Sequence, residues 1–203
     1  MTERSSRGEQ TRSRIIRAAV DLFHQKGARS TSPDEIIEAS RTGKGQFYHY
    51  FKNKEDLVHQ VLQAYVGEIK TGTARIDYEV RSWRGLEQWF LAHLALQQKY
   101  HMTRGCPYGT LGSEVSVDEE LIRQDVSLIF ELIKRKLAAF FIKEKAKSRL
   151  SVRADPERMA DFCVATIQGA MLMGKVTRRS RPVEEVAREA IAHLRSYAVK
   201  SVR

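Results

Sequence analysis

The chain is predicted to be an all-α protein. Only four of its 203 residues are proline and 12 are glycine, so few positions interrupt a helix. Apolar residues recur at helical spacing along most of the chain, and an alternating strand pattern does not persist for long anywhere. Hydrophobic residues make up 42% of the chain, which is enough for a packed core.

Two helices are expected before residue 40. The first covers about residues 10–26, has an apolar stripe on one side and ends at Gly27. The second begins after Ser32, because a hydroxyl residue followed by Pro33 and two acidic residues is typical of a helix start. Both helices are amphipathic, so each is expected to bury one face.

A third, short helix is expected over residues 44–50. Residues 40–43 are too polar to continue the second helix and form a tight turn. Phe47 and Phe51 are spaced i, i+4 and are expected to face inward. Two helices joined by such a turn can present the second one to the major groove of DNA. On geometry alone, a helical hairpin of any other helical protein is an equal alternative.

The rest of the chain is also expected to be helical. Residues 103–110 are rich in Gly, Pro and Thr, which indicates a loop or a short broken helix. The last two helices are apolar on more than one side, so we expect them to pack both inward and against a second copy of the chain. The expected helices cover about residues 53–69, 82–100, 118–147, 155–177 and 183–201.

Two segments carry a more specific pattern. Residues 43–57 are GKGQFYHYFKNKEDL, and residues 11–40 are TRSRIIRAAVDLFHQKGARSTSPDEIIEAS. The first strongly resembles the recognition helix of the TetR/AcrR family of bacterial transcriptional regulators, and the second resembles that family's first two helices. The resemblance implies an N-terminal three-helix helix-turn-helix domain, residues 1–54, and a C-terminal helical ligand-sensing and dimerisation domain, residues 55–203.

The chain departs from the family pattern at one position. Members of the family commonly have glycine where this chain has Arg41. Two explanations are open. Either the turn is built differently here, or Arg41 adds a phosphate contact while Gly43 supplies the flexibility.

The predicted DNA contacts are polar residues at positions that match those used in the family. Lys44 and Lys54 suit phosphates, and Gln46 suits a base edge. Tyr48 and His49 suit a phosphate or a thymine methyl group, although packing of Tyr48 against the first helix is an equal alternative. The full set is Thr31, Ser32, Thr42, Lys44, Gln46, Tyr48, His49 and Lys54.

The positive charge of the chain is concentrated near its start. The net charge is +10, and residues 1–54 hold 11 Lys and Arg against 6 Asp and Glu, which is half of the excess in about a quarter of the chain. Such a region favours polyanions through counterion release. Arg4, Arg7 and Arg12 precede the helix-turn-helix and are candidate backbone contacts, the alternative being ordinary solvation.

A small-molecule effector site is expected in the C-terminal domain. Residues 105–114, GCPYGTLGSE, resemble a segment near the effector pocket in one branch of the family. For each candidate the alternative is an ordinary filled core. Cys106 is either a redox or electrophile sensor or an inert buried thiol. The candidates are Trp89, Phe90, His93, Cys106, Tyr108, Phe130, Phe162, Thr166 and Met173.

Other classes of function lack their motifs. The sequence has no HExxH, Cys-x-x-Cys, P-loop or GxGxxG pattern, so we expect no enzyme activity, no metal site and no cofactor. No apolar run is long enough to span a membrane, and no leader precedes the first helix, so we expect a cytoplasmic protein without membrane contact. Two cysteines do not form a disulfide framework.

The sequence therefore predicts a homodimeric, effector-responsive DNA-binding regulator, most simply a repressor of a palindromic double-stranded operator. Two alternatives are a non-specific nucleoid-type DNA-binding protein and a helical enzyme or carrier with an incidental basic end. The apolar C-terminal two-thirds argues against the first, and the GKGQFYHYF segment argues against the second.

Overall fold

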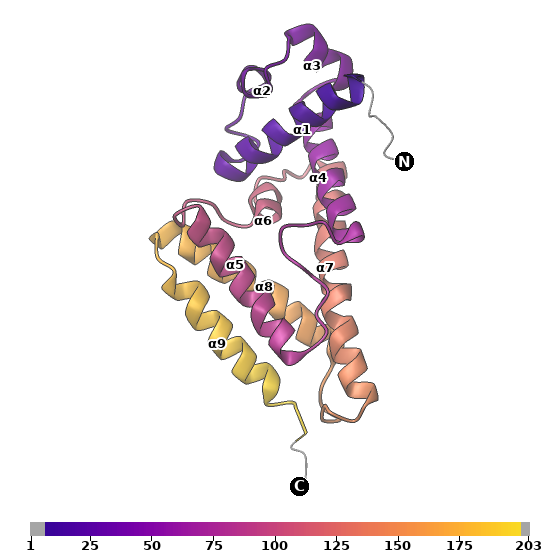
Figure 1. Cartoon of the computed structure of the whole chain (residues 1–203), viewed down its shortest axis with the longest axis vertical. Coiled ribbons are helices and arrows are strands. Elements are labelled where there is room, and N and C mark those ends of the chain that lie inside the picture. The colour runs from indigo at the N-terminus through magenta and orange to yellow at the C-terminus, as the bar shows by residue number, and fades with distance from the viewer. Residues whose placement is uncertain (1–6, 200–203) are drawn as a thin grey trace. The chain divides into compact units, whose positions relative to one another are not determined.

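The computed structural model describes residues 7–199, and within them the chain forms nine α-helices (Figure 1). The predicted all-α fold is confirmed, since the described residues contain no strand beyond an isolated β-bridge between Leu150 and Ala198. In chain order the helices are α1 (Arg7–Lys26), α2 (Pro33–Ser40), α3 (Lys44–Tyr50), α4 (Lys54–Thr71), α5 (Trp83–Lys99), α6 (Pro107–Gly112), α7 (Glu120–Ala146), α8 (Pro156–Thr177) and α9 (Arg181–Arg195).

The chain divides into two compact units. Helices α1, α2, α3 and α6 lie in the first unit, α5, α8 and α9 lie in the second, and the boundaries fall within α4 and α7. The assignment of DNA binding to residues 1–54 and of ligand sensing to residues 55–203 stays a prediction. The first unit joins Met1–Tyr65 to Pro107–Ser127, and the second joins Val66–Cys106 to Leu128–Arg203.

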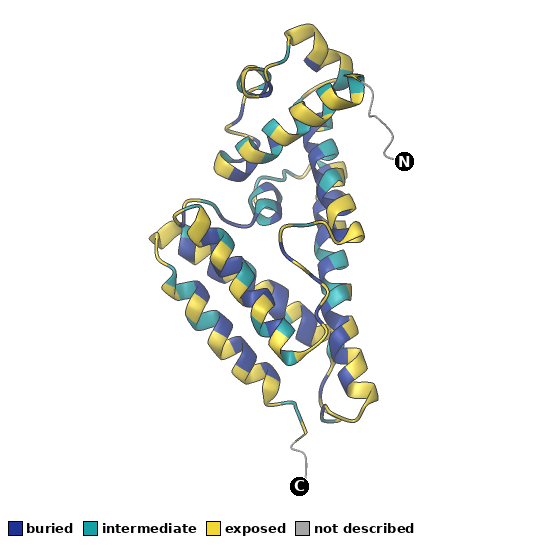
Figure 2. Ribbon diagram, in the orientation of Figure 1, coloured by how far each residue is buried: buried dark blue, intermediate teal, exposed yellow. Residues whose placement is uncertain are grey.

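The core of the N-terminal helices is aromatic and aliphatic. Phe47 lies in α3, and Phe51 is the first residue after that helix. Both are 0% exposed, and their ring centroids lie 5.7 Å apart. Their predicted inward orientation is confirmed, and Figure 2 shows the alternation of buried and exposed positions along these helices. Burial of one such side chain contributes roughly 1.5–3 kcal/mol. Ile15, Ala19, Phe23 and Ile36 complete this core.

The predicted start of α2 is confirmed by a capping box. Ser32 Oγ accepts a hydrogen bond from the Glu35 backbone N–H (3.3 Å), and the Ser32 N–H donates to Glu35 Oε2 (2.8 Å). Lys26, in the last turn of α1, pairs with the same carboxylate. The Lys26 hydrogen bond, followed by those of Ser32, lowers the pKa of Glu35 to about 2. One glutamate therefore fixes the start of α2 and joins it to α1.

The turn between α2 and α3 takes its left-handed residue from Arg41. Arg41 has φ 52°, and its N–H donates to the Glu38 carbonyl (3.0 Å). Gly43 has φ −84°, a value that any residue adopts, and serves as the N-cap of α3. Gly43 therefore does not supply the flexibility of the turn, contrary to the second explanation above, whereas a phosphate contact by Arg41 stays a prediction. The turn has the geometry that glycine favours, with arginine in its place.

The last helix ends earlier than residue 201, the predicted limit. It stops at Arg195 because the following backbone pairs with the segment after α7. The Ser151 N–H donates to the Tyr197 carbonyl (2.8 Å), and the Val199 N–H donates to the Arg149 carbonyl (2.9 Å). These bonds connect positions almost fifty residues apart, which helical periodicity does not reveal.

The second unit is built on α5, α8 and α9, which lie side by side (Figure 1). Gln97 of α5 donates from Nε2 to the Met171 carbonyl of α8 (2.7 Å). Arg195 of α9 donates to Glu87 of α5 (2.8 Å). The side chains of α5 thus fix both neighbouring helices through polar contacts as well as apolar packing.

Arg41→Gly should stabilise the protein. A non-glycine residue in the left-handed region costs about 1–2 kcal/mol, and the added flexibility of the unfolded chain cancels part of the gain, so we expect about 0.5–1 kcal/mol. Urea unfolding at fixed protein concentration measures this gain in the free energy of unfolding. Arg41→Ala is the control, because it removes the same charge and retains the strained Cβ. Equal unfolding free energies for the two variants would contradict the account.

Candidate nucleic-acid interface

Helix α3 presents a polar surface in front of its buried phenylalanines. Lys44, Gln46 and His49 are exposed, and Tyr48 is 50% exposed with its ring edge-on to Phe47 at 5.2 Å. The helix has only seven residues, so its stability comes from packing rather than from its own hydrogen bonds. The arrangement places donors and acceptors on the outside of a helix that is held from behind.

The N-terminus of α3 uses part of this polar set for itself. The Gly43 N–H donates to Gln46 Oε1 (3.2 Å), which leaves the Nε2 group of Gln46 as its remaining donor. Lys44 Nζ lies 3.1 Å from Asp34 Oδ1, with both side chains about 70% exposed. An exposed pair of this kind contributes little and opens readily. Lys44 therefore remains free to exchange this partner for a phosphate.

The other predicted DNA contacts differ in accessibility. Ser32 is exposed at the start of α2, whereas Thr31 is 1% exposed and its hydroxyl donates to the Gly27 carbonyl (2.7 Å). Thr42 is half-buried and shares a hydrogen bond with Ser40 (2.8 Å). The structure thus brings Ser32 to the surface with the α3 residues and does not bring Thr31 there. A DNA contact by Thr31, which stays a prediction, requires its hydroxyl to change partner.

Among the arginines proposed as backbone contacts, only Arg7 is exposed within the described residues. Arg12 is half-buried and donates to Gln60 of α4, so its guanidinium group helps to hold α1 against α4. Arg4 lies outside the described residues. Arg14 and Arg17, which were not among the predicted DNA contacts, are also exposed on α1. Their helical spacing from Arg7 was the available indication.

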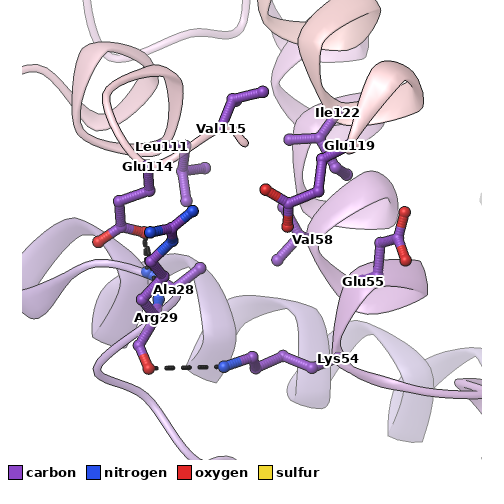
Figure 3. A pocket seen from close by; sticks show the side chains of 10 residues that line it. All are labelled: Ala28, Arg29, Lys54, Glu55, Val58, Leu111, Glu114, Val115, Glu119 and Ile122. Carbon is purple, nitrogen blue, oxygen red and sulfur yellow. Dashed lines mark hydrogen bonds between the residues drawn. The ribbon is translucent and has the colours of Figure 1, made fainter. Parts of the chain in front are cut away.

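A small cavity lies beside the turn between α1 and α2 (Figure 3). Glu114, which follows α6, accepts hydrogen bonds from the backbone N–H groups of Ala28 (2.7 Å) and Arg29 (3.2 Å). Lys54 Nζ donates to the Arg29 carbonyl (3.5 Å). The cavity measures about 100 Å³. Lys54, predicted to contact a phosphate, thus also supports this turn, and Glu114 is a structural residue that sequence analysis missed.

The predicted effector residues of α5 form a tight ring cluster. Trp89, Phe90 and His93 are buried, and the Trp89 ring lies 4.8 Å from Phe90 and 4.6 Å from His93. His93 Nδ1 lies 2.8 Å from the Trp89 carbonyl. Among the described residues, Trp89 Nε1 has no hydrogen-bond partner, nor has Gln97 Oε1. Dense packing fits a filled core, whereas unpartnered buried polar atoms fit a site that takes a further molecule.

The remaining predicted effector residues are distributed over three other helices and a loop. Cys106 and Tyr108 are buried, and Tyr108 stacks edge-on against Tyr65 at 4.9 Å. Phe130, Phe162 and Thr166 are half-buried, while Met173 is 52% exposed on the outer side of α8. Tyr108 belongs to the first unit and the others to the second. An effector role for each of these residues stays a prediction.

No cluster of three or more His, Cys, Asp or Glu side chains within residues 7–199 has the geometry to bind a metal ion. None of the helices in this described range combines the length and apolar character that membrane crossing demands.

Comparison with known proteins adds independent information. Residues 15–61 match the family described as "Bacterial regulatory proteins, tetR family", and residues 83–190 match "Tetracyclin repressor-like, C-terminal domain". The chain is 31% identical over 189 residues to "Transcriptional regulator AcuR" of Cereibacter sphaeroides, covering 86% of this chain and 80% of that protein. It is 25% identical over 176 residues to "HTH-type transcriptional repressor DhaR" of Mycobacterium sp., with coverage of 86% and 87%.

A solved structure is similar to this chain over nearly its whole length. The crystal structure of regulatory protein TetR from Rhodobacter sphaeroides superposes with a TM-score of 0.79 at 28% sequence identity. The match covers 93% of this chain and 99% of that one. The similarity therefore extends over both units of the chain.

The buried His93 should make stability depend on pH. Burial lowers its pKa from 6.5 to about 4, so the folded chain keeps the imidazole neutral where the unfolded chain binds a proton. The contribution of the neutral His93 to the free energy of unfolding is complete above pH 6.5. It is lost as the pH falls toward 4. From pH 6.5 to 5 the free energy of unfolding should fall by about 1.5 kcal/mol through this group.

His93→Gln tests this expectation, because glutamine retains an N–H donor for the Trp89 carbonyl and does not titrate. Urea unfolding at several pH values should show a flatter dependence between pH 6.5 and 5 than in the unaltered chain. Identical slopes for the two proteins would show that His93 is not kept neutral in the fold.

Proposed function

Because the chain belongs to the TetR family of bacterial regulatory proteins, we propose that it is an effector-responsive repressor that binds a palindromic DNA operator as a homodimer. The observation that carries the proposal is the exposed polar face of α3 in front of the buried Phe47 and Phe51. The family is one of transcription regulators, which is not a class of enzyme, and we propose no enzymatic activity. Because its proposed partner is DNA, we propose a cytoplasmic location.

The DNA interface is proposed to centre on α3. Lys44 and Tyr48 offer donors to phosphate oxygens, and His49 is also exposed. A helix of this kind enters the major groove with its N-terminal residues toward the bases. The exposed Ser32 adds a hydroxyl group at the start of α2.

A second copy is proposed to cover the outer side of α8. Leu172, Met173 and Val176 are 60%, 52% and 69% exposed, and they form one apolar stripe at spacings of one, three and four residues. A Cβ atom added at Gly169, one turn earlier, would meet nothing within 4 Å, so a partner helix can approach closely there. Contiguous exposed apolar surface of this kind marks an interaction site. Dimerisation supplies two α3 helices, which need a palindromic operator with half-sites about one DNA turn apart or a small multiple.

Effector response is proposed to act through α6. This helix carries Tyr108, a predicted effector contact, and Glu114 follows it by only two residues. The Glu114 carboxylate holds the Ala28 and Arg29 N–H groups, at the turn from which α2 starts. A ligand that favours a displaced α6 would weaken these bonds and shift the population away from the DNA-binding conformation. The relative DhaR is named a repressor, which supports release rather than capture of DNA as the response.

The proposal is tested by selecting duplexes from a random DNA pool with the purified protein. One enriched palindromic sequence, bound at least about a thousandfold more tightly than random DNA, is the expected outcome. A non-specific nucleoid-type protein would show a poor ratio of these affinities with steep salt dependence, and a carrier or enzyme would bind no duplex at low salt. Either outcome would reject the proposal.

Lys44→Ala should weaken binding to the selected duplex and reduce its salt dependence. The proposed dimer loses one phosphate contact in each subunit, so the slope of log affinity against log salt should fall by about two units. Lys70→Ala, at the exposed end of α4, is the control for loss of a charge elsewhere. Anisotropy titrations over a salt series give both quantities. A slope equal to that of the control would remove Lys44 from the phosphate contacts.

Leu172→Glu should convert the dimer into monomers. It places a charge in the proposed apolar interface, where an unpaired carboxylate is strongly unfavourable. Sedimentation velocity should show the mass of one chain, and affinity for the palindrome should fall. Val117→Glu is the control, since Val117 is 99% exposed and belongs to the first unit rather than to α8. A variant that sediments like the unaltered protein would exclude this face of α8.

A further inference from the structure

The second unit has a basic hollow where the end of α5 meets the turn between α8 and α9 (Figure 1). Its volume is about 520 Å³, which is within the range of small-molecule sites. Gln98, His101 and Met102 line it from the end of α5, and residues 178–181 line it from the turn. Both segments belong to the second unit, so the hollow lies within one compact part of the chain.

The two segments that meet at the basic hollow carry only positive charge. Residues 97–106 and 174–183 contain six Lys and Arg and no Asp or Glu, although 25 of the 203 residues of the chain are acidic. Arg181 pairs with Glu185, one turn further along α9 (2.7 Å). Arg179 has no ion-pair partner among the described residues. Like charges held close together oppose folding, and a bound anion relieves this repulsion.

The backbone around the basic hollow adopts a conformation that is rare for residues with a side chain. Within residues 7–199, five non-glycine residues have a positive φ, and three of them line the hollow: His101 (50°), Met102 (56°) and Arg178 (56°). The Arg178 guanidinium donates to the Met102 carbonyl (3.2 Å), so the two strained segments are joined directly. Strained residues gather at functional sites, because the surrounding structure must keep them in place. Their concentration here therefore indicates a binding site.

The donors of the basic hollow suit a phosphate group. Arginine presents a planar fork of N–H groups that matches phosphate oxygens. Helix α9 also begins here, and its N-cap Ser180 makes no side-chain cap, so its first N–H groups are left for an outside acceptor. A phosphate ester carries a charge of about −1.5 to −2 at neutral pH, which matches several arginines better than one carboxylate does. His101 supplies the sole ring among the lining residues, so a nucleobase has little to stack on.

We propose that the basic hollow binds a small phosphorylated metabolite without a nucleobase, and that Arg178 and Arg179 contact its phosphate group. The site is separate from the polar surface of α3 and from the exposed apolar stripe of α8. Binding connects the end of α5 to the start of α9 through the anion and so stabilises the second unit. The inference does not depend on the proposed function, because neither the ligand nor its binding assay involves an operator.

Calorimetric titration of the full chain with inorganic pyrophosphate tests the site. The buffer contains about 0.15 M sodium chloride, which screens non-specific attraction beyond about 8 Å. Arg179→Gln removes the arginine that lacks an ion pair, and Arg179→Lys retains its charge without the fork. Arg84→Gln, at the exposed start of α5 in the same unit, is the matched control. Malonate serves as a dicarboxylate comparison, and circular dichroism checks the helix content of each variant.

The unaltered chain should bind pyrophosphate saturably, and Arg179→Gln should bind it at least about tenfold more weakly. Arg179→Lys should fall between the two, because lysine is a point charge that cannot bind two oxygens in a fork. Arg84→Gln should match the unaltered chain. Pyrophosphate should also raise the melting temperature of the unaltered chain more than that of Arg179→Gln.

Three results would overturn the proposal. Titrations that do not saturate, or an Arg179→Gln affinity equal to that of Arg84→Gln, would remove the site. Tighter binding of malonate than of pyrophosphate would replace the phosphate group with carboxylates. Absence of pyrophosphate binding, together with weaker binding of a random DNA duplex by Arg179→Gln than by Arg84→Gln, would assign this surface to nucleic acid. The selection of an operator from random DNA is decided separately from all three.

Discussion

The burial of Phe47 and Phe51 is the constraint on which the DNA-binding surface depends. A helix of seven residues is not stable alone in water, because too few backbone bonds compensate the entropy of forming it. Burial of two phenylalanines contributes roughly 3–6 kcal/mol, which is enough to hold α3 in place. The i, i+4 spacing puts both rings on one side of the helix and His49 on the opposite side, while Lys44 and Tyr48 are also exposed. The same packing therefore determines both the stability of the helix and its outward surface.

A second constraint acts on the turn from α1 to α2. Gly27 has φ 85°, and the hydroxyl group of Thr31 closes the turn onto its carbonyl. A Cβ at Gly27 would lie 1.8 Å from Glu114 Oε1, so glycine allows this carboxylate to reach the Ala28 and Arg29 N–H groups. The segment after α6 is thus attached by charge-assisted hydrogen bonds to the turn that positions α2. A contact of this kind lets a change at α6 alter the helix-turn-helix without any ligand touching it.

The sequence predicted the features that depend on local pattern. Helical spacing, the cap at Ser32 and the resemblance of residues 43–57 were sufficient for the fold class, the family and the inward orientation of Phe47. Features that depend on contacts between distant segments were missed: Glu114 binds a turn 85 residues away, and α9 ends where its chain meets residues 149–151. Arg41 was noticed as a departure from the family pattern, but its left-handed backbone was not predicted, since a strained residue contradicts local propensity and is visible only in its backbone angles.

The central claim is that α3 enters the major groove of operator DNA, and site-directed cleavage tests it most directly. An iron–EDTA group attached at His49→Cys generates hydroxyl radicals next to the exposed side of α3, while the native Cys106 and Cys163 are buried and stay unlabelled. Lys99→Cys, at the exposed end of α5, is the control. The account predicts two clusters of strand cuts related by the operator dyad for the His49 label alone. Cuts that are absent, or that match those of the Lys99 label, would contradict it.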